Sequence, residues 1–347
     1  MSLKNEIDDK MDNESQFPEN LPENRGTDLH DSTEGVPDPQ VENADKWTAQ
    51  GRSVISAAII GLIIIGALYV FAQTVFAAAG IMISGLLGKI LISPKDAAAL
   101  ISSSPGMFVT PIRWAVLLSE FVVLLFGVIL FIRRWHTPHV FQYVRLTRAP
   151  ITEIFLAVIG TVMLIPVGSY ISNAMQMYFH INTDMEDVVQ RLLTAYSMPE
   201  FLFLVIVAAI APAICEEFFF RGYIQRTFER SMGVHSVFLV GVLFGLFHFE
   251  PLGLITLSLI GIWLGFVYYR SKSLLPNMAG HFTNNFIALW IAYRAPVILG
   301  VSAQSDSQIP ILWVLATIPL FALIAWIYYM TTASRCEYQN ISKTRAH

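Results

Sequence analysis

The chain has 347 residues, of which 54% are hydrophobic and only 14% are charged, with a mean hydropathy of +0.56. This composition excludes an ordinary soluble enzyme and, at this length, indicates a polytopic membrane bundle. The net charge of −4 is unevenly distributed, because residues 1–50 contain 13 of the 26 acidic side chains and only 4 of the 22 basic ones. The sequence therefore predicts an acidic tail followed by an all-α membrane domain.

The cysteine, lysine and arginine residues argue against two further classes of protein, those built on cysteine pairs and those that bind nucleic acid. Cys215 and Cys336 lie far apart, so the sequence offers neither a disulfide framework nor a CxxC metal clamp. No run of clustered Lys and Arg is present of the kind that binds nucleic acid. Nucleic acid is therefore not an expected partner.

The first 50 residues are rich in Asp, Glu, Asn, Pro and Ser and poor in large apolar side chains. Such a segment cannot bury enough surface to offset its conformational entropy, so we expect residues 1–50 to be disordered. Apolar segments long enough to span a bilayer follow at 53–80, 111–132, 152–178, 199–226, 234–250, 252–269, 274–294 and 309–332. The sequence thus predicts about eight transmembrane helices, with a short turn at 250–253 between the fifth and the sixth.

Orientation follows from the basic side chains that flank these segments. They occur in four of the connections, at Arg133, Arg134, Arg145 and Arg148, at Arg226 and Arg230, at Arg270 and Lys272, and at Arg335, Lys343 and Arg345. All four connections fall on one side of the predicted bundle. We therefore expect both termini to be cytoplasmic, in a multi-pass protein of a plasma membrane of bacterial type.

Ionisable side chains inside a bilayer are costly, and they mark functional sites. Glu216, Glu217 and Arg221 interrupt the fourth apolar segment. Glu216 lies ten residues before Arg226, which corresponds to about 15 Å along a helix and a depth near the middle of the membrane. Glu217 and Arg221 are four residues apart and can pair on one helix face, whereas Glu216 is left to take and give protons.

Two histidines lie at a similar expected depth on later segments. His248 is in the fifth segment and His281 in the seventh, where Asn285 shares its helix face. A lone histidine in a membrane helix usually forms a hydrogen bond to another helix. Glu216, Glu217 and Arg221 can equally be interpreted as a structural ion cluster that holds helices together. Six polar side chains at one depth on three helices favour a site instead.

Other conspicuous residues are read as structural. We interpret Glu120, in the second segment, as a structural partner, with contact to substrate or a proton as the alternative. Glycines 241, 245, 261 and 265 suit close approach of helices. The remaining histidines are expected to be solvated: His30, His136, His139, His180, His235 and His347.

Glu216-Glu217-xxx-Arg221, Phe244-xxx-His248 and His281-xxx-Asn285 follow one another on successive apolar segments. In this order and spacing they resemble the three motifs of the CPBP intramembrane proteases, which include the type II CAAX prenyl endopeptidases. The resemblance covers residues 200–290. It implies that residues 199–294 form the catalytic core. Composition and hydropathy divide the rest of the chain into a disordered acidic cytoplasmic tail at 1–50, N-terminal transmembrane helices at 51–198, and a last transmembrane helix with a cytoplasmic C-terminal tail at 295–347.

The resemblance implies roles for the six residues. Glu216 would be the general base for water, helped by His248, and Arg221 would fix Glu217. His281 and Asn285 would stabilise the oxyanion or position the scissile carbonyl. A zinc ion held by Glu216, His248 and His281 is the competing mechanism, because two imidazoles and a carboxylate form a known catalytic set.

The expected function is hydrolysis of a peptide bond in a membrane-associated peptide or protein, prenylated or not, near the cytoplasmic leaflet. The partners are therefore this substrate and the lipid bilayer. Two alternatives stay open: a non-catalytic scaffold, immunity or regulatory protein, and a proton-coupled transporter that uses the buried Glu and His side chains.

Overall fold

The computed structural model describes residues 45–87, 106–179, 191–299 and 311–333. All described residues belong to one structural unit, Gly35–His347. Within the described ranges the regular secondary structure is entirely helical. The elements are α2 (Lys46–Ala49), α3 (Val54–Leu87), α5 (Gly106–Ser119), η2 (Glu120–Leu125), α6 (Phe126–Trp135), α7 (Val140–Tyr143), α8 (Ile151–Phe179), α10 (Met198–Val205), η3 (Ile206–Ile210), α11 (Ala211–Glu217), η4 (Phe218–Gln225), α12 (Arg226–Met232), α13 (His235–Phe247), α14 (Leu254–Ser271), α15 (Leu275–Leu299) and α16 (Ile311–Thr331).

Six of the described helical stretches are long and apolar enough to cross a membrane, which confirms an all-α integral membrane protein. They are Val54–Ser84, Phe108–Trp135, Ile151–Phe179, Met198–Met232, Leu254–Ser271 and Ile311–Thr331. The prediction of about eight transmembrane helices is confirmed only for these six.

The other two predicted segments are helical but differ from the expectation. The fifth was expected over 234–250, whereas α13 ends at Phe247 and is too short to count as a spanning helix. The seventh corresponds to α15, in which His281, Asn284 and Asn285 lower the hydropathy. The turn predicted at 250–253 is confirmed, since no helix forms between Phe247 and Leu254.

Three π-helical segments, labelled η, interrupt spanning helices close to the candidate residues. Glu120 begins η2, η3 lies just before α11, and η4 begins at Phe218 directly after Glu217. A π-helical turn inserts an extra residue and rotates the side chains that follow, and such turns are frequent at functional sites. Two of them, η3 and η4, directly flank α11, the helix that carries Glu216.

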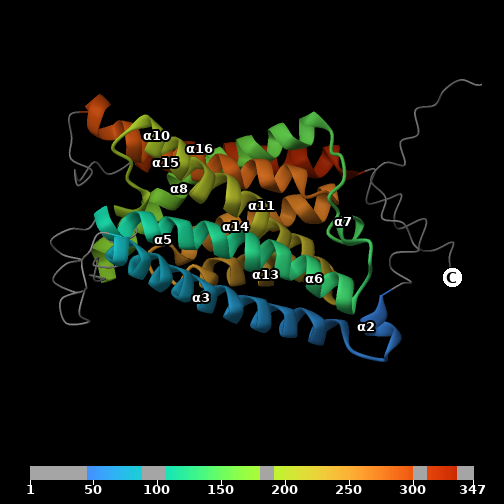
Figure 1. Ribbon diagram of the computed structural model, residues 1–347. Coiled ribbons are helices and arrows are strands. Elements are labelled where there is room, and N and C mark those ends of the chain that lie inside the picture. The colour runs from blue at the N-terminus through green and yellow to red at the C-terminus, as the bar shows by residue number, and fades with distance from the viewer. Residues whose placement is uncertain (1–44, 88–105, 180–190, 300–310, 334–347) are drawn as a thin grey trace, which may run out of the picture. The chain divides into compact units, whose positions relative to one another are not determined.

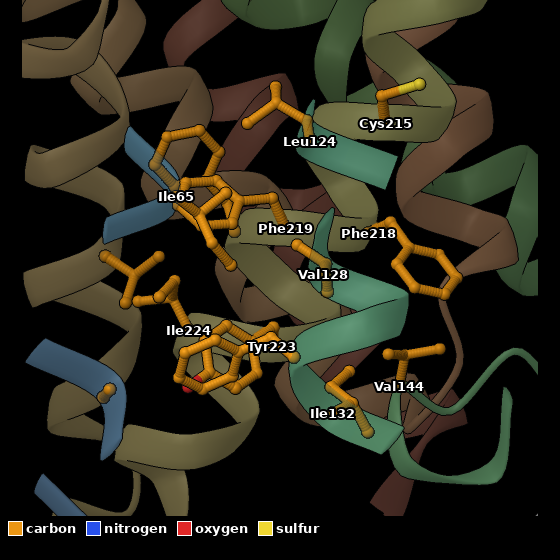
Figure 2. Packing of buried hydrophobic residues seen from close by; sticks show 14 of the residues in the cluster. Ile65, Leu124, Val128, Ile132, Val144, Cys215, Phe218, Phe219, Tyr223 and Ile224 are labelled. Carbon is orange, nitrogen blue, oxygen red and sulfur yellow. The ribbon is translucent and has the colours of Figure 1, made fainter. Parts of the chain in front are cut away.

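The main apolar core lies where α3, η2, α6 and the α11–η4 stretch meet. Ile65 of α3, Leu124 and Val128 of the second span, and Phe219 and Ile224 of the fourth are all almost fully buried. Figure 2 shows these side chains together, and in it Phe218 and Phe219 project in different directions from the same helix. Burial of the fourth span by this core fixes the rotation of the helix that carries Glu216.

Close glycine contacts join α13 to α14, which lie side by side in Figure 1. A Cβ atom on Gly241 would lie 2.6 Å from the backbone nitrogen of Ile262, and one on Gly261 would lie 2.6 Å from the carbonyl oxygen of Gly241. The predicted role of these glycines in helix approach is confirmed. This contact brings the Gly261 carbonyl and the end of α13 to the site.

Basic side chains from three predicted loops converge at one end of the helices. Arg145 donates two hydrogen bonds to the Glu229 carboxylate, at 2.7 and 2.9 Å, and Lys272 donates one at 2.6 Å. Arg226 donates to the Tyr143 carbonyl oxygen at 3.2 Å. These connections therefore share one side, as the sequence predicts, while the cytoplasmic location of that side stays a prediction.

A second polar cluster at this end corrects two expectations. Asp45, the N-cap of α2, contacts His136 Nδ1 at 3.1 Å and pairs with Arg230. His136 is only 1% exposed, so the prediction that it is solvated is wrong, because a buried aspartate supplies its partner. Residues 45–50 form α2 and a turn, so the predicted disordered tail extends too far at this boundary; its residues 1–44 lie outside the described ranges.

Candidate active site

Glu217 and Arg221 form an ion pair in the fourth spanning helix. Arg221 Nη1 lies 2.7 Å from Glu217 Oε1, and both side chains are fully buried. Arg221 Nη2 donates a second hydrogen bond to the Gly261 carbonyl oxygen at 3.0 Å, and the guanidinium lies over the Phe244 ring. The predicted pairing at a spacing of four residues is present, and it also ties the helix to α14.

His281, on α15, is held by the same carboxylate. Its Nδ1 lies 2.9 Å from Glu217 Oε1, and its ring is almost fully buried. A carboxylate oxygen that already accepts from Arg221 acts here as an acceptor, so His281 Nδ1 carries the proton of this hydrogen bond. The other ring nitrogen, Nε2, faces Glu216 Oε2 at 3.9 Å.

His248 follows the last residue of α13 and reaches the same oxygen from another direction. Its Nδ1 lies 2.8 Å from the Phe244 carbonyl oxygen, which can only accept, so Nδ1 is the protonated nitrogen. Its Nε2 lies 4.0 Å from Glu216 Oε2. The side chain is 28% exposed, in contrast to His281.

Glu216 therefore lies between two imidazoles without touching either directly. The two nitrogen–oxygen distances are too long for direct hydrogen bonds but suit a bridge through one water molecule. Glu216 Oε2 is buried and has no hydrogen-bond partner among the described residues, while the whole side chain is 12% exposed. The arrangement leaves one carboxylate oxygen facing two imidazole nitrogens, His248 Nε2 and His281 Nε2, all of which can accept a hydrogen bond.

Asn285 lies one turn after His281 on α15. Its hydrogen-bond partners are not among the other five candidate residues. Its Nδ2 donates to the Ala208 carbonyl oxygen at 2.9 Å, and its Oδ1 accepts from Asn284 Nδ2 at 3.0 Å. Pro212, four residues after Ala208, has no N–H to offer that carbonyl in the α-helical pattern. Asn285 supplies a donor there and keeps one N–H for another acceptor.

Three of these side chains, Glu216, His248 and His281, are the candidate zinc ligands. Within the described residues, no group of three or more His, Cys, Asp or Glu side chains is arranged to hold a metal ion. The atoms of Glu216, His248 and His281 that face one another are those already described at 3.9 and 4.0 Å. We derive no step through a metal, and zinc stays an untested expectation.

Sequence reasoning did not identify Tyr69, whose hydroxyl donates to Glu120 Oε1 at 2.7 Å. A tyrosine in an apolar helix is ordinarily read as packing, and no spacing relates α3 to the second span. The Gly261 and Ala208 carbonyls were missed for the same reason, because backbone acceptors leave no mark in a sequence. Glu120 itself was identified only as an intramembrane carboxylate.

Comparison with known proteins bears on the same stretch of chain. Residues 198–287 match the sequence model of a family described as Type II CAAX prenyl endopeptidase Rce1-like. The matched stretch contains all six candidate residues and confirms the resemblance indicated by the three motifs. No curated protein and no solved structure gives a match. The family match supports an endopeptidase of the CAAX type within an integral membrane protein.

Proposed function

We propose that this protein is an intramembrane endopeptidase in which Glu216 activates a water molecule. The substrate is a membrane-associated peptide or protein, prenylated or not, cleaved near the cytoplasmic leaflet. The observation that carries the proposal is the pair of acceptors, Glu216 Oε2 and His248 Nε2, 4.0 Å apart within the stretch that matches a peptidase family.

A water molecule placed between these acceptors would donate one hydrogen to each of them. Glu216 takes the proton as the water oxygen attacks the scissile carbonyl carbon, and His248 keeps the water oriented. When the tetrahedral intermediate collapses, the C–N bond breaks and the protonated Glu216 returns its proton to the leaving nitrogen. Such positioned acid–base catalysis contributes about 10²- to 10⁴-fold to a rate.

The developing oxyanion needs donors, and α15 supplies two. The free N–H of Asn285 is one of them. His281 Nε2 is the other when the ring carries both protons, a form that the Glu217 carboxylate on Nδ1 stabilises. Loss of one such donor typically costs about 10²- to 10³-fold in kcat.

The test is cleavage of a defined peptide by purified protein in proteoliposomes. We expect a farnesylated peptide with a C-terminal CAAX sequence, or its unprenylated counterpart, to be cut, with the product identified by mass spectrometry. Glu216→Gln is expected to lower kcat by about 10²- to 10⁴-fold without changing the thermal unfolding temperature.

Glu200→Gln is the matched control, because Glu200 lies on the same spanning stretch and pairs with Arg113 instead. It should retain cleavage. Wild-type rates in Glu216→Gln would overturn the proposed role of Glu216. Solute uptake that depends on Glu216 and His281, without any cleavage, would favour the transporter instead.

A further inference from the structure

A cavity of about 390 Å³ lies at the end of the second spanning stretch. The last turns of α6 and the segment that leads into α7 form it, and Figure 1 shows these two helices at the same end of the molecule as α2. None of the six candidate catalytic residues lines it, and neither does any carboxylate. The cavity is therefore separate from the candidate active site.

The lining of this cavity has an apolar part and a polar part. Ile129, Val140 and Phe141 form the apolar part, whereas Arg133, His139 and Gln142 form the polar part. The three polar side chains and Phe141 are exposed. An occupant should therefore combine hydrocarbon with a polar group that accepts hydrogen bonds or carries a negative charge.

An apolar stripe leads from the cavity along α6 toward the middle of the span. Phe126, Ile129, Leu130 and Arg133 follow one another at i, i+3, i+4 and i+7 on this α-helix, so they share one face. Phe126 and Leu130 are 55% and 51% exposed, although they lie within a membrane-spanning stretch. Side chains exposed there face lipid hydrocarbon. The apolar part of the cavity is thus continuous with a lipid-facing surface.

The other end of the stripe is cationic. Arg133 is exposed, and no ion pair among the described residues involves it. Lys46 Nζ donates to the Arg133 carbonyl oxygen at 3.4 Å, and the Arg134 guanidinium lies 5.8 Å from the centroid of the Trp135 ring. Three cationic side chains therefore lie around the last turn of α6, at the depth where a spanning helix meets the headgroups.

Two carboxylates at this end of the described helices are turned inward. Asp45 is 3% exposed and pairs with Arg230, and Glu229 is 11% exposed and pairs with two basic side chains. The charge presented around the cavity is therefore positive. A headgroup of net negative charge is attracted by these cations, whereas a zwitterionic headgroup would bring a positive charge to the same place.

We propose that this cavity binds an anionic phospholipid, with the phosphate at Arg133 and a hydrocarbon chain along Phe126 and Leu130. His139 and Gln142 add neutral hydrogen-bond donors for the headgroup oxygens. Basic pockets at the cytoplasmic ends of membrane helices bind lipid headgroups in this way. The inference goes beyond the proposed function and does not depend on it, because it concerns residues that the mechanism does not use.

The test measures phosphatidylglycerol bound to purified protein from phosphatidylcholine nanodiscs that contain a minority of phosphatidylglycerol. Native mass spectrometry counts the lipids that remain bound. We expect enrichment of phosphatidylglycerol on the wild type, an affinity about fivefold lower in Arg133→Gln, and most of the affinity retained in Arg133→Lys, since one basic side chain near an anionic lipid has an effect of this size. Undiminished enrichment in Arg133→Gln would overturn the proposal.

Two further variants separate binding in the cavity from folding and from diffuse surface attraction. Ile129→Trp fills the apolar part without changing the charge, and it should also lower the enrichment. Arg52→Gln is the matched control, because Arg52 is exposed beside α2, with its guanidinium over the Trp47 ring, and does not line the cavity. It should retain the enrichment. Equal losses in Arg52→Gln and Arg133→Gln would show attraction to the whole surface and contradict a site. The unfolding temperatures of all variants in pure phosphatidylcholine should match that of the wild type.

Photochemical cross-linking identifies the occupant directly. Replacement of Phe141 by p-benzoylphenylalanine keeps an aromatic ring in the cavity and adds a reactive ketone. In the same nanodiscs, the cross-linked product should be phosphatidylglycerol at more than its share of the bilayer. Phosphatidylcholine and phosphatidylglycerol captured in their bulk ratio would refute selective binding. Capture of a peptide from residues 1–44, or of a second copy of the chain, would assign the cavity to that occupant and refute the lipid.

Discussion

Glu217 Oε1 accepts hydrogen bonds from two different helices, from Arg221 Nη1 at 2.7 Å on its own helix and from His281 Nδ1 at 2.9 Å on α15. One buried oxygen thereby links an ion pair to the orientation of an imidazole. Because Arg221 also donates to Gly261, three helices are joined through a single carboxylate and its partner. Glu217 and Glu216, adjacent in sequence, thus have different surroundings: one is paired and fixed, and the other is left facing the histidines.

The stability of this link can be measured by a double-mutant cycle. Glu217→Leu should destabilise the protein by about 3–5 kcal/mol, because removing one partner leaves Arg221 as an uncompensated buried charge. Glu217→Leu with Arg221→Leu should cost less than the sum of the two single substitutions. Thermal unfolding in detergent measures the three variants. Additive losses would contradict a coupled pair.

His248 is predicted to matter for activity and little for stability. His248→Ala removes the Nε2 that faces Glu216 and should lower kcat by about 10²- to 10⁴-fold. The side chain is partly exposed and its hydrogen bond ends a helix, so the unfolding temperature should change little. His235→Ala, at the exposed start of the same helix, is the control and should change neither quantity. A loss of stability in His248→Ala that matches the loss of activity would argue for a structural histidine.

The α13–α14 contact gives a prediction about helix separation. Gly241→Ala places a Cβ atom 2.6 Å from the Ile262 backbone nitrogen, so the helices must move apart, at a cost of about 1–3 kcal/mol. Movement of α14 also displaces the Gly261 carbonyl from Arg221, so activity should fall as well. Gly127→Ala is the control, because nothing lies within 4 Å of its added methyl group. Equal unfolding temperatures for the two variants would contradict the close packing.

Asp45 gives a prediction about acid stability. Burial by itself raises the pKa of its carboxyl group, but the hydrogen bonds and charges of His136 and Arg230 outweigh this and hold the pKa below its ordinary value of 3.8. A group with a lowered folded-state pKa stabilises the fold above the unfolded-state pKa, and this stabilisation is lost as the pH falls below it.

Asp45→Asn should therefore cost about 1–3 kcal/mol near neutral pH. The gap in unfolding temperature between wild type and Asp45→Asn should be constant down to about pH 5 and narrow below about pH 4. Melting curves across this range in detergent provide the measurement. A gap that widens in acid would contradict the sign of the shift.

Several of these relationships could be anticipated from the sequence. The positions of the helices follow from long apolar runs, and Glu217 with Arg221 follows from a spacing of four residues on one helix. The three motifs on successive segments were sufficient to indicate the family that residues 198–287 match. Such features are local, because each depends on one helix and on the order of segments along the chain.

Other relationships could not be anticipated, and His136 and His248 show why. His136 reads as a loop residue, but Asp45, 91 positions earlier, makes it part of a buried cluster. The predicted depth of His248 assumed a continuous helix, whereas α13 ends one residue before it. The partner of His136 comes from another element, and hydropathy contains no information about partners. Hydropathy likewise does not show where within an apolar run a helix ends.

By itself the sequence determined an all-α membrane protein and a short set of polar residues too costly to bury without a purpose. Only the tertiary structure decided which nitrogen of each histidine faces Glu216 and that the Tyr69 hydroxyl donates to Glu120. The physical reason is that helical periodicity fixes which side chains share a face of one helix. The rotation and register between helices depend on packing, here on the π-helical turns and on the approach of Gly241 to Gly261.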